Sequence, residues 1–184
     1  MQIRQILFVT TFFTIVFCAS FISAQTSQAS ESVNVIHLQH GSVTVRSPES
    51  WVIIKHQVGS TSDLIAFQIL DPADEGTDDS TNVSVIAFDL RVVNTALKFT
   101  QSVLEHGKLK HPEKENGKWL IYTWHSKQEE TNYEIRDCYL TSNQYGIYVR
   151  LAFPKLEKTT KEWSTKLEVD FKQLLDTLEV RQMK

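Results

Sequence analysis

Short runs of β-branched and aromatic residues, several with apolar side chains at every second position, alternate along the first half of the chain with turn-forming residues. This is the pattern of strands with one buried face. The first two runs flank a turn at His40 and Gly41 and predict a hairpin. Five strands are expected before residue 92, at 33–38, 42–46, 51–56, 63–70 and 83–91, with an acidic loop at 71–82.

The spacing of apolar residues then changes to that of a helix. Asn94 is suited to the N-cap, and Gly107 is suited to the position that ends the helix. Between them the apolar residues keep helical spacing, at Ala96, Leu97, Phe99, Val103 and Leu104. Three further strands follow at 119–126, 133–141 and 145–153, joined by tight connections at 129–132 and 142–144. They predict an antiparallel three-stranded meander.

The last element is a long amphipathic helix. Its apolar side chains fall on one face, at Trp163, Leu167, Phe171, Leu174, Leu175 and Leu178. Strands, one mid-chain helix, a meander and a closing helix predict an α+β domain, in which both helices pack on an antiparallel β-sheet.

The chain has 184 residues, of which 41% are hydrophobic and 22% charged, with a net charge of −3. This composition excludes a collagen-like or disordered chain and leaves room for one domain. The near balance of charges gives no reason to expect nucleic acid or anionic lipid as a partner.

Residues 1–24 have the features of a secretory signal peptide. Arg4 precedes an apolar stretch that ends in small residues, and we expect cleavage after Ala24. An uncleaved membrane anchor stays open, because roughly 20 apolar residues span a bilayer. Lipoprotein processing at Cys18 also stays open, although Phe17 stands where a small residue is needed. The polar residues 25–32 are expected to form a flexible tether.

Export places the mature chain in the periplasm or outside the cell, with no stable membrane span after cleavage. Loss of the leader leaves Cys138 as the only cysteine, so no internal disulfide can form. The domain is therefore held by its hydrophobic core, in which we expect Cys138 to be a small buried side chain.

Five stretches of the chain carry a resemblance to a known fold. They are VTVRSPESW, VSVIAFDLR before the first helix, NGKWLIYTW at the start of the meander, YGIYVRLAFP as its last strand and FKQLLDTLEV in the closing helix. In this order they resemble the PsbP/MOG1-like fold, which includes small exported bacterial domains. The resemblance covers residues 33–180 and implies a single domain over 33–184.

Relatives with this fold mostly act by binding, in photosystem assembly, in the binding of a small GTPase and in the cell envelope. The resemblance therefore implies a binding protein, and it supplies no catalytic residues. Fold alone does not fix function.

Neither a metal nor a cofactor is expected. The six histidines show no ligand spacing with one another or with cysteine, at His37, His40, His56, His106, His111 and His125. The acidic stretch 71–82 departs from a calcium-binding EF-hand loop, because Ala73 and Asn82 stand at the third and twelfth positions. A solvated connection is the expected structure there.

One pair of side chains suggests catalysis. His125 and Asp137 lie on neighbouring predicted strands, where they could form an acid–base pair of a small hydrolase. No nucleophile motif accompanies them, so a structural hydrogen-bonded pair is the competing interpretation.

Strand alternation also predicts a surface. Tyr122 and Trp124 share one side of their strand, Glu134 and Arg136 share a side of the next, and Tyr148 and Arg150 share a side of the third. If the register aligns these sides, they form the aromatic and arginine patch typical of protein interfaces. The alternative is that a helix covers this face.

These observations favour an exported, non-catalytic protein of the cell envelope that binds a protein partner or a small ligand. An immunity protein that neutralises an envelope-delivered toxin is a narrower hypothesis. The hydrolase that uses His125 and Asp137 is the enzymatic alternative.

Overall fold

The computed structural model describes residues 30–57, 62–74, 80–109 and 118–182. The predicted leader at 1–24 lies outside these ranges. The strands are β1 (Glu31–Leu38), β2 (Gly41–Pro48), β3 (Val52–Gln57), β4 (Ser62–Ile69), β5 (Thr81–Asp89), β6 (Leu120–Gln128), β7 (Thr131–Ser142), β8 (Tyr145–Pro154) and β9 (Glu179–Gln182). The helices are α1 (Val93–Leu109), α2 (Lys161–Thr177) and a short 3-10 turn at Pro72–Asp74.

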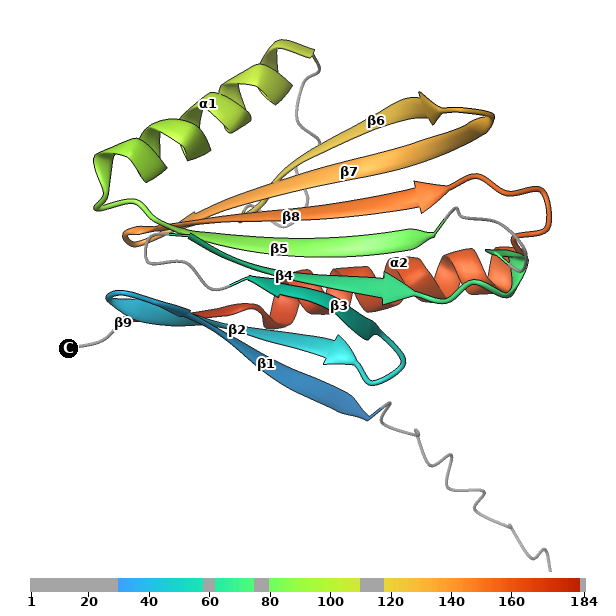
Figure 1. Cartoon of the computed structure of the whole chain (residues 1–184), viewed down its shortest axis with the longest axis horizontal. Helices are drawn as coiled ribbons and strands as arrows, with labels where there is room; N and C mark the ends of the chain where they lie inside the picture. The colour runs from blue at the N-terminus through green and yellow to red at the C-terminus, as the bar shows by residue number, and fades with distance from the viewer. Residues whose placement is uncertain (1–29, 58–61, 75–79, 110–117, 183–184) are drawn as a thin grey trace, which may run out of the picture.

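The strands form two antiparallel sheets (Figure 1). The larger sheet has the order β3-β4-β5-β8-β7-β6, and the smaller one has the order β1-β2-β9. The α+β class with a mainly antiparallel sheet is thus confirmed. Within the described ranges, neither α1 nor α2 is long and apolar enough to cross a membrane.

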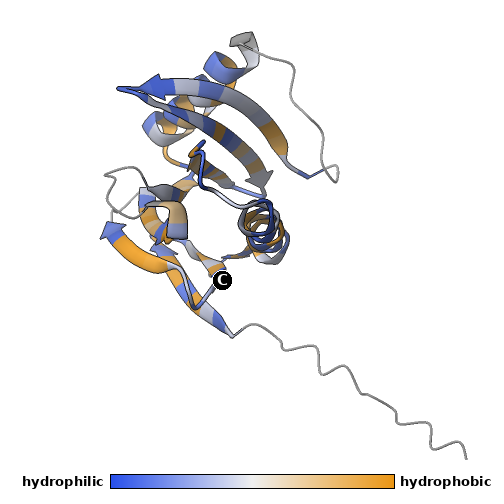
Figure 2. Ribbon diagram, turned by 90° about the vertical axis from the view of Figure 1, so that its right-hand side faces the viewer, coloured by the Kyte–Doolittle hydropathy of each residue, from blue (hydrophilic) through white to orange (hydrophobic). Residues whose placement is uncertain are grey.

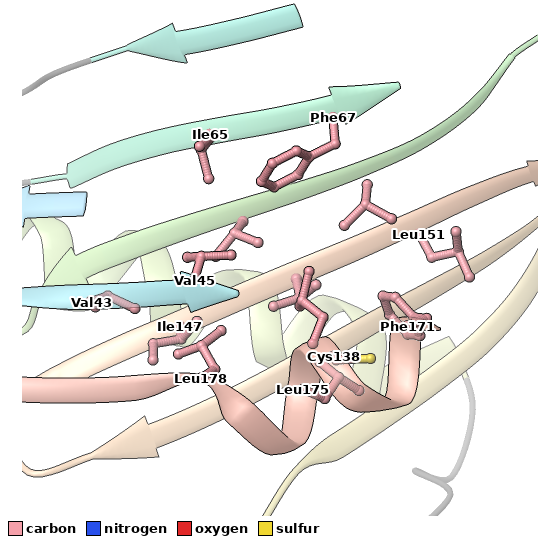
Figure 3. Packing of buried hydrophobic residues seen from close by; sticks show 14 of the residues in the cluster. Val43, Val45, Ile65, Phe67, Cys138, Ile147, Leu151, Phe171, Leu175 and Leu178 are labelled. Carbon is pink, nitrogen blue, oxygen red and sulfur yellow. The ribbon is translucent and has the colours of Figure 1, made fainter. Parts of the chain in front are cut away.

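The six-stranded sheet separates the two helices. In Figures 1 and 2, α1 lies on one of its faces, and α2 lies on the other together with the three-stranded sheet. Both sheets and α2 share one hydrophobic core, which includes Val43, Val45, Phe67, Leu151 and Phe171 (Figure 3). The α1 side has a smaller buried cluster made of Phe99, Tyr122 and Tyr139.

Tight turns connect β6 to β7 and β7 to β8. Glu129 and Asn143 in these turns have positive φ angles of 51° and 55°. Asn tolerates this left-handed conformation well, and positive φ suits a two-residue hairpin turn because it matches the twist of the strands. The three strands are thereby fixed in one register.

The chain after α2 is extended, although the sequence pattern predicted that the helix continues through Val180. Thr160 caps the start of α2 by accepting a hydrogen bond from the Trp163 backbone N–H, at 3.2 Å. The helix ends at Thr177, and Leu178 adopts extended angles and is buried in the main core. The four residues of β9 then pair with β2. Pairing with a free strand edge outweighed the local helical pattern.

The bounds of α1 also differ from the prediction. The helix begins at Val93, so Asn94 lies inside it, and the backbone N–H groups of Thr95 and Ala96 donate to the Val92 carbonyl. Gly107 does not end the helix, which continues to Leu109. Gly107 lacks the positive φ that a helix-ending glycine adopts.

The buried face of α1 matches the predicted apolar spacing only in part. Leu97 and Leu104 are 54% and 58% exposed. Phe99 of the predicted apolar set is buried, and Ala96 and Val103 are half-buried. Thr95 is buried on the same side, and Ser102 and His106 are half-buried there. The sheet beneath α1 presents hydroxyl and carboxylate groups, which need polar partners.

The predicted tether extends two residues too far. β1 begins at Glu31, which pairs with Pro48, and the Ser32 hydroxyl lies 3.0 Å from that of Ser47. Backbone pairing with β2 thus orders the chain from Glu31 onward.

Gly41 of β2 lies in close contact with Tyr145 of β8 and with the backbone of β9, and substitution tests this packing. A Cβ atom there would lie 2.2 Å from the Tyr145 hydroxyl and 2.5 Å from the Arg181 carbonyl, so Gly41→Ala must displace β9. We expect it to lower the free energy of unfolding by about 1–3 kcal/mol, measured by urea denaturation. The matched control is Gly107→Ala, whose nearest contact would be 3.6 Å. It should raise stability by roughly 0.5–1 kcal/mol, because alanine favours a helix interior. Equal effects of the two variants would contradict this packing.

Candidate functional site

The register of β6, β7 and β8 determines which predicted site residues share a face. Tyr122 pairs with Asp137, which pairs with Arg150, and Tyr139 pairs with Tyr148. Directly opposite residues in an antiparallel pair project to the same face. The α1 face therefore carries four of the five residues predicted for the patch, Tyr122, Trp124, Tyr148 and Arg150.

Asp137 is at the centre of this group and is completely buried. Its Oδ1 accepts hydrogen bonds from the Tyr148 hydroxyl at 2.6 Å and from Arg150 Nε at 2.7 Å. Its Oδ2 accepts from Trp124 Nε1 at 2.8 Å and from the Arg150 guanidinium at 3.1 Å. His106 of α1 places Nε2 2.8 Å from the same Oδ2. The charge of the carboxylate is thus compensated from both the sheet and the helix.

These contacts keep Asp137 ionised. Burial alone would raise its pKa, but hydrogen bonds from Arg150, Tyr148 and Trp124 hold the pKa below its usual value. Burial and the adjacent carboxylate raise the pKa of Tyr148, so its hydroxyl stays a donor. The Arg150 guanidinium also lies over the rings of Trp124 and Tyr148, at 5.7 and 5.6 Å from their centroids.

The other ring nitrogen of His106 makes a second set of contacts, to α1 and to the sheet. Its Nδ1 lies 2.9 Å from the Ser102 backbone carbonyl and 3.0 Å from the Tyr139 hydroxyl. The Ser102 hydroxyl lies 2.8 Å from that of Tyr139, not on the imidazole. A serine nucleophile needs a direct hydrogen bond to its base. The arrangement therefore attaches α1 to the sheet and does not form a Ser-His-Asp triad.

The predicted pair of His125 and Asp137 does not form. His125 pairs with Glu134 and faces the α2 side of the sheet, whereas Asp137 faces α1. His125 is 65% exposed, and its nearest carboxylate is Glu134, at 4.0 Å. The separation follows from strand alternation, because positions 134 and 137 of β7 differ by an odd number. The specific geometry of the hydrolase hypothesis is therefore wrong.

Arg136 likewise departs from the expected patch. It pairs with Thr123 and Leu151 on the α2 face, opposite to Trp124 and Arg150. The alignment of Glu134 and Arg136 with the aromatic residues was thus wrong by one residue of register, since Asp137 takes the position next to Arg150.

Arg136 instead joins β7 to α2. Its guanidinium donates to Glu134, at 2.6 Å, and to Glu168 of α2. Burial alone would lower its pKa, but the two carboxylates hold the pKa above its usual value. Glu134 also accepts from Lys155, at 2.7 Å. The four side chains form a charged network across the gap between sheet and helix.

A cleft of about 440 Å³ lies beside this network, between α2 and the strands β6 and β7. Its apolar lining consists of Ile121, Val169, Phe171 and Leu175, and its charged rim consists of Arg136, Glu168 and Lys172. Three of the apolar side chains are buried, and Val169 is 58% exposed. The cleft thus has an apolar floor and an open charged edge.

The predicted patch on the α1 face of the sheet is less accessible to a partner than the cleft on the α2 side. Tyr122 and Tyr139 are 5% and 2% exposed beneath the helix, and the side chain of Arg150 is 37% exposed at its border. Of the predicted patch residues on this face, Tyr122 is buried and Tyr148 is half-buried. Trp124 and Arg150 remain at the edge of the covered region.

A second buried carboxylate, Asp89, connects the two sheets. Arg91 donates to both of its oxygens at 2.8 Å, and His40 Nδ1 from the β1–β2 turn lies 2.9 Å away. Arg91 also donates to the Tyr145 hydroxyl, which donates to the His40 carbonyl at 2.6 Å. The hydrogen bonds from Arg91, with a smaller one from His40, lower the pKa of Asp89 to about 2.

Sequence reasoning missed His106 as a member of the Asp137 group. A signal was present, because Thr95, Ser102 and His106 are spaced by seven and four residues and so share one helix face with Phe99. Polar side chains on the buried face of a helix indicate buried polar partners.

Within residues 30–57, 62–74, 80–109 and 118–182, no group of three or more His, Cys, Asp or Glu side chains is placed to hold a metal ion.

The acid dependence of stability tests the Asp89 group. Because the folded-state pKa is depressed, its stabilisation is fully present above the ordinary carboxylate pKa of 3.8 and is lost as the pH falls through about 2. We expect Asp89→Asn to lower stability at pH 7 and to flatten the loss of stability between pH 4 and 2, as measured by urea unfolding across this range. The exposed Asp176→Asn control should keep the wild-type profile. Parallel acid profiles for wild type and Asp89→Asn would contradict this assignment.

No protein-family profile matches the chain, and no curated protein is similar to it. A crystal structure at 1.50 Å resolution of a protein from Bacteroides thetaiotaomicron is similar over 76% of this chain, with 15% sequence identity and a TM-score of 0.47. The similarity covers 45% of that protein, so this chain spans less than half of its length. The description of that structure names no activity, ligand or partner.

Proposed function

We propose that the protein is an exported, non-catalytic binding protein of the cell envelope, and that the cleft between α2 and β6–β7 receives a segment of its protein partner. The observation that carries this proposal is the combination of a buried apolar floor and a charged rim in one cleft. Its volume of about 440 Å³ is in the range of binding pockets, roughly 300–1,000 Å³.

The walls of the cleft are well suited to binding without rearrangement. Phe171 and Leu175 are fixed in the main core, and the Arg136 contacts to Glu134 and Glu168 hold β7 against α2. Sites built on helices and strands keep their geometry better than sites on loops. An apolar side chain of the partner would occupy the floor, and an acidic neighbour would face Lys172 at the rim.

Two sequence observations support the export and the binding role. The predicted leader directs the chain out of the cytoplasm. The resemblance to the PsbP/MOG1-like fold favours binding over catalysis. An immunity protein that neutralises an envelope-delivered toxin is a narrower form of the same proposal, in which the toxin is the partner.

Val169→Arg tests the cleft, because it places a bulky charge at an exposed position of the lining. The chain from Gln25, carrying an affinity tag, is used to recover partners from the native envelope, and the affinity of the purified partner is then measured. We expect Val169→Arg to weaken binding by about tenfold or more.

The matched control is Val33→Arg on β1, a similarly exposed valine outside the cleft. It should bind like wild type. A partner that binds Val169→Arg as tightly as wild type would remove the cleft as the site. Recovery of no specific partner would contradict the binding role.

A further inference from the structure

Strand β6 forms one border of the six-stranded sheet, and β3 forms the other (Figure 1). Among the described strands, β6 pairs with β7 alone. A border strand presents a row of backbone N–H and C=O groups that can pair with another chain. The two borders of this sheet differ in the features that hinder such pairing.

Strand β3 has two of these features. Its register with β4 shifts between Ile53 and Lys55, which marks a β-bulge, and Lys55 places a charge within the strand. β6 pairs with β7 in one continuous register over nine residues. Its residues 120–124 include neither a charged residue nor a proline. The border at β6 is therefore better suited to the addition of a strand.

The turn after β6 determines which of its backbone groups point outward. Gln128 and Thr131 flank a two-residue turn, so the pair that they form is the hydrogen-bonded one that closes the turn. Hydrogen-bonded and non-hydrogen-bonded pairs alternate along antiparallel strands. The even-numbered residues of β6 therefore bond to β7. The odd-numbered residues, which include Ile121 and His125, direct their N–H and C=O groups away from β7.

The odd-numbered residues of β6 also face the cleft beside α2. Ile121 is part of the cleft floor, and His125 lies on the same side of the sheet. A strand added to β6 would lie about 4.8 Å away. Its residues opposite Ile121 and His125 would project to the α2 side. Every second side chain of the added strand would thus point toward the cleft while its backbone pairs with β6.

The lining of the cleft indicates which side chains that strand carries. Ile121, Phe171 and Leu175 form an apolar floor, which favours apolar side chains. At the rim, Arg136 is bonded to Glu168. Lys172 is exposed and makes no ion pair within the described ranges. An aspartate or glutamate in the added strand would compensate its charge.

We propose that the partner segment binds as an added β-strand, with its backbone paired to the outer edge of β6 and its alternate apolar side chains in the cleft. This inference rests on the proposed function and specifies the conformation of the bound segment and its chemistry, apolar at alternate positions with one acidic residue beside Lys172. A helical segment would fill the cleft without pairing with the β6 backbone, so variants of that backbone distinguish the two.

Peptides selected from a random library provide the probe. They are selected on the chain from Gln25 and counter-selected on Val169→Arg, which restricts them to the cleft. We expect the selected peptides to bind His125→Pro about tenfold more weakly than His125→Ala. Both variants remove the imidazole, but only proline removes the outward N–H, and a border strand tolerates proline at such a position. Urea unfolding verifies that both variants are folded.

Amide exchange measures the same pairing in the wild-type chain and decides the matter if His125→Pro does not fold. The outward amides of Ile121 and His125 should exchange at least about tenfold more slowly when a selected peptide is bound. The amides of Tyr122 and Trp124, which bond to β7, should be protected with or without the peptide.

Three results would overturn strand addition. They are peptides that bind a folded His125→Pro as tightly as His125→Ala, outward amides that gain no protection, and a selection that yields no peptide specific for the cleft. The affinity of the envelope partner for Val169→Arg tests the proposed function separately. A partner weakened by Val169→Arg but not by His125→Pro would keep the cleft as the site and exclude strand pairing.

Discussion

A carboxylate in the middle of a sheet is costly unless donors surround it, and Asp137 is surrounded by four side chains from three different elements. Trp124 comes from β6, Tyr148 and Arg150 come from β8, and His106 comes from α1. The contacts form only when β6, β7 and β8 have their observed register and α1 lies at its observed height. One buried charge thereby specifies the arrangement of the whole α1 side.

The same register also determines which side chains lie on the opposite face of the sheet. Cys138, adjacent to Asp137, points into the main core beneath α2, and Arg136 on the other side points to Glu168. The polar group under α1 and the cleft beside α2 are therefore two consequences of one alternation along β7. Asp89 has a comparable role between the two sheets, where Arg91 and His40 meet it.

The sequence pattern predicted those elements in which the apolar residues are also the ones that the tertiary structure buries. The β1–β2 hairpin follows from its apolar runs and central turn, and most of α2 follows from its apolar face. The failures have tertiary causes. β9 forms because β2 offers a free edge. Leu97 keeps the helical apolar spacing and is nevertheless exposed, because such spacing cannot show that the sheet below α1 is polar. Arg136 was placed with Trp124 because alternation within each strand leaves the register between strands undetermined.

Hydrogen–deuterium exchange of Asp137→Asn tests most directly whether this carboxylate holds α1 on the sheet. The substitution preserves the shape of the side chain and removes the charge that Arg150 and His106 face. If Asp137 anchors the helix, the amides of α1 lose protection while those of α2 keep it, and the exposed Asp176→Asn control exchanges like wild type. Unchanged protection of α1 in Asp137→Asn would contradict the account.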